Sequence, residues 1–163
     1  MTIRRAKGTD IEELLAIYNY EVENGVATFD LVPKTLSEWW NWYNAHNIEN
    51  HPLLVAAEYG KVVGYASLSS YREKEAYKST VELSVYIHAD YRKHGVATAL
   101  MEAILAEARA DERTHTVVSV ITSGNVASEK LHEKFGFEHC GRIREVGMKF
   151  DRYLDIDNYR LGV

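Results

Sequence analysis

Apolar residues recur at helical spacing in the first part of the chain. The stretch "TDIEELLAIYNYEVENG" (residues 9–25) predicts a helix, because its apolar positions fall three or four residues apart. One face of that helix carries Ile11, Leu14, Leu15, Tyr18 and Val22. Thr9 and Glu12 predict a capping box at its start, and Gly25 predicts its end.

The stretch "TLSEWWNWYNAHN" (residues 35–47) repeats this pattern. Thr35 and Glu38 form a second predicted capping box. The apolar stripe of this predicted helix consists of Leu36, Trp39, Trp40 and Tyr43.

The period then changes from that of a helix to that of a strand. "PLLVAAEYGKVVGYASLSSY" (residues 52–71) predicts two strands joined by a tight turn at Tyr59-Gly60. "STVELSVYIHA" (residues 79–89) alternates strictly between two sets of positions. One face carries Val81, Leu83, Val85 and Ile87, and the other carries Glu82, Ser84, Tyr86 and His88.

The rest of the chain alternates between the two periods. We expect helices over residues 95–110 and 125–136, the second with Ala127, Leu131 and Phe135 inward and Gly136 as its cap. A short buried strand is predicted over 115–122, and closing strands are predicted in 137–150 and 152–163. The predicted order is strand, two helices, three strands, helix, strand, helix and two strands. This order indicates an α/β fold with a mixed sheet covered by helices.

Composition narrows the class of protein. A chain of 163 residues, 46% hydrophobic, suits one domain over 1–163. It has 24 acidic and 19 basic residues, and this balance argues against nucleic acid as a partner. With Cys140 as the one cysteine there is no intrachain disulfide, which fits a reducing cytoplasm.

The sequence lacks the signatures of several other classes of protein. The first ten residues have no apolar signal region, and the apolar run "LLVAA" is too short to cross a membrane, so no membrane partner is expected. HExxH and paired CxxC motifs are absent, so we expect no metal site.

The stretch "ADYRKHGVATAL" (residues 89–100) carries the first chemical signal. Basic residues precede a glycine where a strand gives way to a helix, and unpaired backbone N–H groups at a helix start bind phosphate oxygens. Gly95 lets the backbone approach closely, and Ala97 keeps the next position open. Taken alone, this RxxGxA pattern also suits an ordinary strand-to-helix loop.

Spaced motifs along nearly the whole chain resemble the acetyl-CoA-dependent N-acetyltransferase (GNAT) superfamily. Its pyrophosphate loop, [Q/R]xxGx[G/A], is matched by Arg92, Gly95 and Ala97. Asn125 and "LHEKFGF" match its later asparagine and its aromatic before "GF". The resemblance implies the GNAT fold, with a central, splayed, mixed sheet of six to seven strands and about four helices. It also implies acetyl-CoA as co-substrate.

Four segments resemble more closely the phosphinothricin and methionine sulfoximine acetyltransferase group. These segments are "GVATFDLVPKT", "YREKEAYKSTVELSVYIHADYRKHGVA", "NVASEKLHEKFGF" and "VGMKFDRYLDIDNYRL". The resemblance implies acetyl transfer to the amine of a small amino-acid-like substrate, and a homodimer. Lys74 departs from the pattern, standing where that group commonly has arginine, and Arg72 lies two residues earlier.

Two residues are candidates for proton transfer. Glu82 projects from the polar face of an otherwise apolar strand, and the resemblance implies that it lies beside the acetyl group, where a carboxylate can act as base. A solvated or ion-paired strand glutamate is the alternative for this residue. His132 stands where many superfamily members have a tyrosine that protonates the leaving thiolate, and an imidazole can do the same. A histidine on the helix surface is the alternative there.

The resemblance also implies the groups that hold the two substrates. For acetyl-CoA these are the strand backbone at Val85, Tyr86 and Ile87, the loop residues Arg92, Lys93, His94, Gly95, Val96, Ala97 and Thr98, and Asn125. Asn125 also suits a plain helix cap. For the amino acid they are Arg72, Lys74 and Lys149 as cations, with Phe29 and Tyr77 as walls.

Two other functions stay open at this point. Acetylation of a protein N-terminus needs an open groove, whereas the aromatic-rich "YREKEAYKS" suits the wall of a small pocket. A non-catalytic CoA-binding module needs Gly95 and Asn125 but neither Glu82 nor His132.

Overall fold

The computed structural model describes residues 1–163 and has the predicted order of elements. In chain order these are β1 (Thr2–Arg5), α1 (Ile11–Asn24), α2 (Leu36–Asn44), β2 (Leu53–Glu58), β3 (Lys61–Ser70), β4 (Thr80–Ile87), α3 (Val96–Ala110), β5 (Thr116–Thr122), α4 (Val126–Lys134), β6 (Glu138–Lys149) and β7 (Arg152–Gly162). Short 3-10 turns cover Gly8–Asp10, Glu75–Tyr77 and Ala89–Tyr91.

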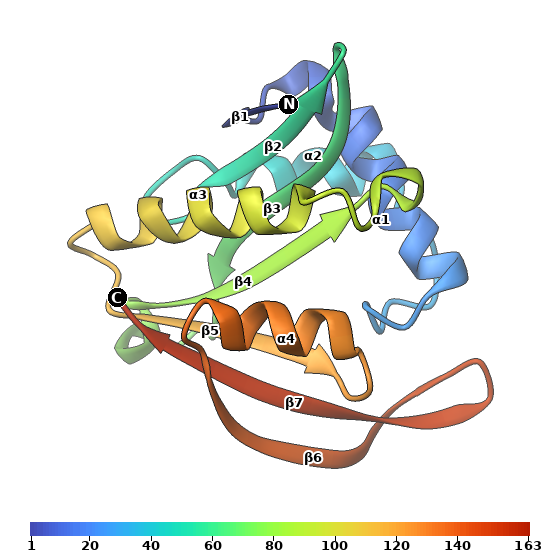
Figure 1. The fold of residues 1–163 in the computed structure, drawn as a ribbon, viewed down its shortest axis with the longest axis vertical. Coiled ribbons are helices and arrows are strands. Elements are labelled where there is room, and N and C mark those ends of the chain that lie inside the picture. Colours follow the sequence, from blue (N-terminus) through green and yellow to red (C-terminus); the bar gives the residue numbers. More distant parts are fainter.

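All seven strands form one mixed sheet in the order β1-β2-β3-β4-β5-β7-β6 (Figure 1). Neighbouring strands are antiparallel except β4 and β5, which are parallel because α3 connects them. The β2–β3 turn is the predicted Tyr59-Gly60 pair, with both residues at positive φ (50° and 76°), as the tight turns of hairpins require.

The sheet splits between its two parallel strands. β4 and β5 pair over three positions only, ending at Glu82↔Val118. Beyond that point β4 runs on to Ile87 and β5 to Thr122 with no pairing between them, and the two ribbons diverge (Figure 1). The predicted splayed sheet is confirmed, and the divergence leaves one edge of β4 without a strand partner.

Two hydrophobic cores cover the two faces of the sheet. On one face α3 packs Leu100 and Ile104 against Ala66 and Leu68 of β3, and α4 adds Leu131. Figure 1 shows α3 and α4 crossing in front of the sheet. The core on the opposite face is built by Ile11, Leu14 and Ile17 of α1, Trp39 of α2, and Val55 and Tyr65 of the sheet.

Some local predictions were wrong. The first helix does not use Thr9 and Glu12 as a capping box; a 3-10 turn precedes it, and the Asp10 carboxylate accepts from the N–H of Lys7 at 2.7 Å. Ala127 is exposed, because the buried residue of α4 is His132. Leu36 and Trp40 are also exposed, so of the predicted stripe of α2 only Trp39 is buried, with Tyr43 partly buried against the same core. The Thr35–Glu38 box is confirmed.

None of the helices is both long enough and apolar enough to cross a membrane. No group of three or more histidine, cysteine or acidic side chains is arranged to hold a metal ion.

Candidate active site

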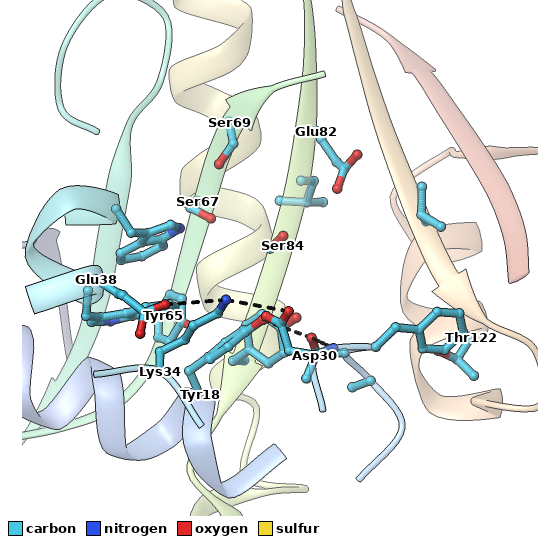
Figure 2. Close-up of a pocket in the computed structure, with 18 of the residues that line it drawn as sticks. Tyr18, Asp30, Lys34, Glu38, Tyr65, Ser67, Ser69, Glu82, Ser84 and Thr122 are labelled. Atoms are coloured by element: carbon cyan, nitrogen blue, oxygen red, sulfur yellow. Dashed lines mark hydrogen bonds and ion pairs between the residues drawn. The ribbon is translucent and has the colours of Figure 1, made fainter. Parts of the chain in front are cut away.

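A cavity of about 610 Å³ lies on the α1 and α2 side of the sheet, where β4 separates from β5. Its walls come from β3 and β4, from α1 and α2 with the connection between them, and from β5 and β7. The polar lining consists of Thr28, Asp30, Lys34, Glu38, Ser67, Ser69, Glu82, Ser84 and Thr122. Figure 2 shows Ser67 and Ser69 on one strand, and Ser84 and Glu82 on the next.

Glu82 lies on this lining at the point where the sheet splits. It pairs with Ser69 of β3 and is the last residue of β4 that pairs with β5. Burial raises the pKa of its carboxyl above the usual value, because desolvation disfavours the charged form. The predicted base is therefore a half-buried carboxyl group in the cavity, and a raised pKa makes it a better proton acceptor.

Four tethers hold the connection between α1 and α2 over the cavity. Tyr18 Oη donates to the Asp30 carboxylate, and it lies 2.9 Å from Thr28 Oγ1. Thr122 Oγ1 donates to the Val26 carbonyl at 2.6 Å, and Lys149 Nζ donates to the Thr28 carbonyl at 2.9 Å. These bonds hold Phe29, which the resemblance implies as a wall of the substrate site, in the lining of the cavity.

Lys149 does not line the cavity. Its side chain is buried, its pKa is lowered by desolvation, and its ammonium donates to the carbonyls of Glu21 and Thr28. It therefore holds the backbone next to Phe29 and does not reach the cavity itself. Gly147 belongs to the same packing, because a Cβ there would lie 2.3 Å from the Phe29 ring.

The start of α3 is the one long-helix start in the chain that follows a glycine. Gly95 is its N-cap at φ 79°, with no side-chain cap and no acidic residue in the first turn. The first bond of the helix runs from the Ala99 N–H to the Gly95 carbonyl, so the N–H groups of Val96, Ala97 and Thr98 have no intrahelical partner. By contrast, side chains cap α2 and α4. The arrangement suits an anion.

The basic residues of this loop differ in their surroundings. Lys93 stands at a positive φ of 63°, and Lys93 and His94 are exposed. Arg92 is paired with Glu21 of α1, which ties the loop to the first helix. Val96 points its side chain into the core, so only its backbone faces the loop.

The strand residues expected to contact acetyl-CoA lie along the unpaired edge of β4. Val85 and Ile87 pack against the α3-side core, whereas Tyr86 lines the cavity. Their backbone groups on the β5 side lie beyond the last β4–β5 pair, so they face the opening of the sheet.

Asn125 and His132 both have partners within the chain. Asn125 caps α4, and its Oδ1 accepts from the Ser128 N–H at 3.2 Å. His132 is 4% exposed, which excludes the surface-histidine alternative. Its Nδ1 lies 2.7 Å from the Ser128 carbonyl and its Nε2 lies 2.8 Å from Ser119 Oγ, and burial lowers its pKa. It is not part of the cavity lining.

The other predicted substrate residues lie outside the lining, on the connection between β3 and β4. Arg72 and Lys74 are exposed. The Arg72 guanidinium lies over the rings of Tyr71 and Tyr77, 5.0 and 5.6 Å from their centroids. Within a single chain, therefore, Phe29 lines the cavity but Arg72, Lys74 and Tyr77 do not.

Sequence reasoning missed most of the aromatic lining. Tyr18, Trp39, Trp42, Tyr65 and Tyr86 all line the cavity. The hydrophobic pattern assigns each of them only to a helix or a strand. One usable signal was the alternation in "GYASLSS", which places Tyr65, Ser67 and Ser69 on a single face of β3.

Comparisons with known proteins agree with this geometry. The sequence profile described as "Acetyltransferase (GNAT) family" matches residues 14–137. The chain is 39% identical to the L-methionine sulfoximine/L-methionine sulfone acetyltransferase of Pseudomonas paraeruginosa, over 99% of this chain and 94% of that protein.

Two solved structures superpose closely. The ribosomal-protein-alanine N-acetyltransferase from Brucella melitensis has a TM-score of 0.96 at 37% identity, covering 100% of both chains. The GNAT superfamily phosphinothricin acetyltransferase from Sinorhizobium meliloti, in complex with AcCoA, has a TM-score of 0.95 at 30% identity, covering 99% of this chain and 88% of that one. Profile, sequence and fold therefore agree that this chain belongs to the acetyltransferase (GNAT) family.

Proposed function

We propose that this protein transfers the acetyl group of acetyl-CoA to the amine of a small amino acid of the methionine sulfoximine or phosphinothricin type. Transfer is direct, within a complex of both substrates. The observation that carries the proposal is the position of Glu82, where an amino-acid-sized cavity meets the split in the sheet. The relatives that match the chain over nearly its full length support the substrate class.

The groups present fit acetyl-CoA. The start of α3 has N–H donors without side-chain caps, which suits a pyrophosphate, and the edge of β4 beyond Glu82 has no strand partner, which suits a pantetheine chain. Lys93 and His94 add positive charge beside that helix start. Asn125 supplies an amide for hydrogen bonds to the pantetheine while it caps α4. Acetyl-CoA supplies the activated acetyl group and the leaving thiol.

Glu82 takes the proton of the substrate ammonium, directly or through a water molecule. An amino-acid amine is protonated at neutral pH and must lose that proton before it can attack. A half-buried carboxylate in the cavity lining accepts a proton more readily than an exposed one, because its pKa is raised. The backbone N–H groups of β4 near Val85 then stabilise the negative charge that develops on the acetyl oxygen.

The role of His132 as proton donor to the thiolate stays a prediction. A buried imidazole with a lowered pKa is neutral near pH 7 and carries one proton, which lies on Nδ1 because the Ser128 carbonyl can only accept, while Nε2 accepts from the Ser119 hydroxyl. A transfer from His132 therefore requires one of these bonds to break.

For the substrate carboxylate we propose Arg72 and Lys74, which lie outside the lining on the connection between β3 and β4. Arg72 follows β3 closely and is held over two aromatic rings, which leaves its N–H groups free to bind an anion. Lys74 is the second cation there, and Tyr77 is a wall. Lys149 contributes by holding Phe29 in place.

We also propose a homodimer located in the cytoplasm, where acetyl-CoA is available to the enzyme. Large apolar side chains are exposed along the far end of the β6–β7 hairpin, at Ile143, Val146, Met148, Phe150 and Tyr153. An apolar surface of this kind is typical of a protein–protein contact. The single sheet from Thr2 to Gly162 supports one domain over 1–163.

The test is release of CoA thiol with a panel of amines: methionine sulfoximine, methionine sulfone, phosphinothricin, free methionine and a peptide that begins with alanine. We expect turnover with methionine sulfoximine and methionine sulfone, and little turnover with the peptide. Turnover with the peptide alone would favour the protein N-terminal alternative. CoA binding without thiol release from any amine would favour a non-catalytic module.

A further inference from the structure

Two hydrogen-bond donors in the cavity wall have no partner in the protein. They are the indole N–H of Trp39 and the hydroxyl of Tyr65, both buried. Trp39 is 4% exposed and Tyr65 is 1% exposed, and both line the cavity. A buried donor without an acceptor destabilises the folded state, so such groups in a binding cavity indicate a ligand acceptor.

A closed cycle of aromatic rings holds these two donors. The ring pairs, with centroid separations, are Tyr18–Trp39 (4.6 Å), Trp39–Trp42 (4.3 Å), Trp42–Tyr65 (5.7 Å), Tyr65–Tyr86 (5.5 Å) and Tyr86–Tyr18 (5.4 Å). The cycle spans α1, α2, β3 and β4, so neither donor can turn away without displacing its neighbours. Trp42 stacks on Trp39 and also contacts Tyr65, which places both donor side chains in one part of the lining.

The remaining lining argues that the acceptor is uncharged. The lining carries three carboxyl groups, Asp30, Glu38 and Glu82, and one cation, Lys34. Lys34 lies between two of them, 3.7 Å from Asp30 and 3.8 Å from Glu38, as Figure 2 shows. An anionic side chain would meet a net negative wall, whereas the substrate ammonium is attracted to it.

Both donors keep their protons. An indole N–H donates only, and burial raises the pKa of Tyr65 well above its usual value, so the phenol stays neutral. Ser69 on the same strand is already engaged, since its Oγ lies 2.7 Å from His46 Nε2.

We propose that Trp39 and Tyr65 determine specificity by donating hydrogen bonds to an uncharged oxygen on the side chain of the amino-acid substrate. A sulfone or sulfoximine oxygen has this chemistry; a thioether lacks the oxygen, and a phosphinate carries a charge. This inference rests on the proposed function and specifies the substrate class within it. Binding of an analogue without the oxygen leaves both donors unpaired, and sites of this kind reject such analogues strongly.

The decisive variant is Tyr65→Phe, which removes one oxygen and keeps the ring. We compare kcat/KM for methionine sulfone and for methionine, which differ only in the two sulfone oxygens. The ratio of the two should fall about tenfold, since the lost bond is made to the sulfone alone. The loss should be in KM, because a bond remote from the reacting amine is equally strong before and during the reaction.

Trp39→Phe tests the other donor, with a second pair of variants as controls. Trp40→Phe and Tyr43→Phe make the same chemical changes on α2 at residues outside the lining, and both should leave the ratio unchanged. Thermal unfolding is measured for all four variants. Tyr65→Phe should not lower the melting temperature, because its hydroxyl has no partner in the protein.

The results for Tyr65→Phe and for the wild type either support or overturn the proposed role of Trp39 and Tyr65. An unchanged ratio in Tyr65→Phe, or an equal loss for both substrates with a lower melting temperature, overturns the inference and assigns the hydroxyl a structural role, for example with a bound water. Preference of the wild type for phosphinothricin over the sulfone also overturns it. In each of these cases the wild type still acetylates an amino acid. If it acetylates none, the proposed function fails, and this inference fails with it.

Discussion

At the scale of single residues, Glu82 shows how position changes the chemistry of a common side chain. A strand glutamate normally faces water, but the opposite face of β4 is part of a core and this face lines a cavity. Desolvation raises the pKa of its carboxyl above the ordinary value for glutamate. The structure places no cation of the lining against it; Lys34 is paired with Asp30 and Glu38.

Glu82→Gln tests the assignment of the base. Turnover near pH 7 should fall about 100-fold or more, because the amide cannot accept the ammonium proton. CoA affinity should be unchanged, since Glu82 lies away from the start of α3. Wild-type turnover should decline as the pH falls through the raised pKa of Glu82, because the carboxylate becomes protonated.

The pH profile of the variant separates catalysis from structure. Part of the lost turnover should return at higher pH, where more of the amine arrives already neutral. Full turnover at pH 7 with an unchanged melting temperature would show that the proton leaves by another route.

At the scale of elements, the start of α3 is distinct because of what its first turn lacks. An N-cap glycine, no acidic residue and no capping side chain leave the helix N–H groups and the positive end of the dipole open. In α2 the Thr35–Glu38 box uses the same groups internally. The difference between the two helix starts follows from the residues at the N-cap and in the first turn.

Gly95→Asp should weaken CoA binding, measured by calorimetry, by about tenfold or more. The change adds a negative charge where the pyrophosphate is expected, and it places a side chain at a positive φ. Gly95→Ala separates the two effects, because it introduces the backbone strain without the charge.

Gly60→Asp is the matched control. Gly60 also has a positive φ of 76°, and a Cβ added there would meet no atom within 4 Å, but it lies in the β2–β3 turn. The substitution should cost stability and leave CoA affinity unchanged. Equal affinities for wild type and Gly95→Asp would contradict the loop assignment.

At the scale of the whole molecule, the β6–β7 hairpin forms one edge of the sheet, and most residues of its outer strand β6 are exposed. Its far end extends beyond the rest of the fold (Figure 1). It exposes Val146 and Phe150, each about half accessible, close in the chain to Lys149, which supports the cavity wall. A partner bound there would bury apolar surface next to the active site.

Light scattering at micromolar concentration should give twice the mass of the 18.6 kDa chain. Val146→Lys should shift the distribution towards the single chain, because a charge would be placed in a buried apolar contact. Tyr59→Lys, at the fully exposed β2–β3 turn, should leave the mass unchanged. A wild-type mass of one chain would remove the dimer proposal.

The sequence by itself determined the order of elements, the hairpin turn and the loop before α3. These features are local: hydrophobic period, capping residues and glycine positions act within a few residues of one another. Strict alternation in β4 was enough to separate the face that carries Glu82 from the face that joins the core. The family resemblance added the chemistry that this pattern serves.

Only the tertiary structure decided which side chains share the cavity. Lys149, predicted to bind the substrate, is buried outside the lining and donates to the carbonyls of Glu21 and Thr28. His132 is buried between Ser128 and Ser119, which a surface residue would not be, and its role as proton donor stays a prediction. The stripe residue Trp39 and the strand residue Tyr65 proved to be unpaired donors in the cavity wall. The physical reason is that hydrogen-bond partners and burial depend on residues far apart in the chain, brought together when α1, α2 and the sheet pack.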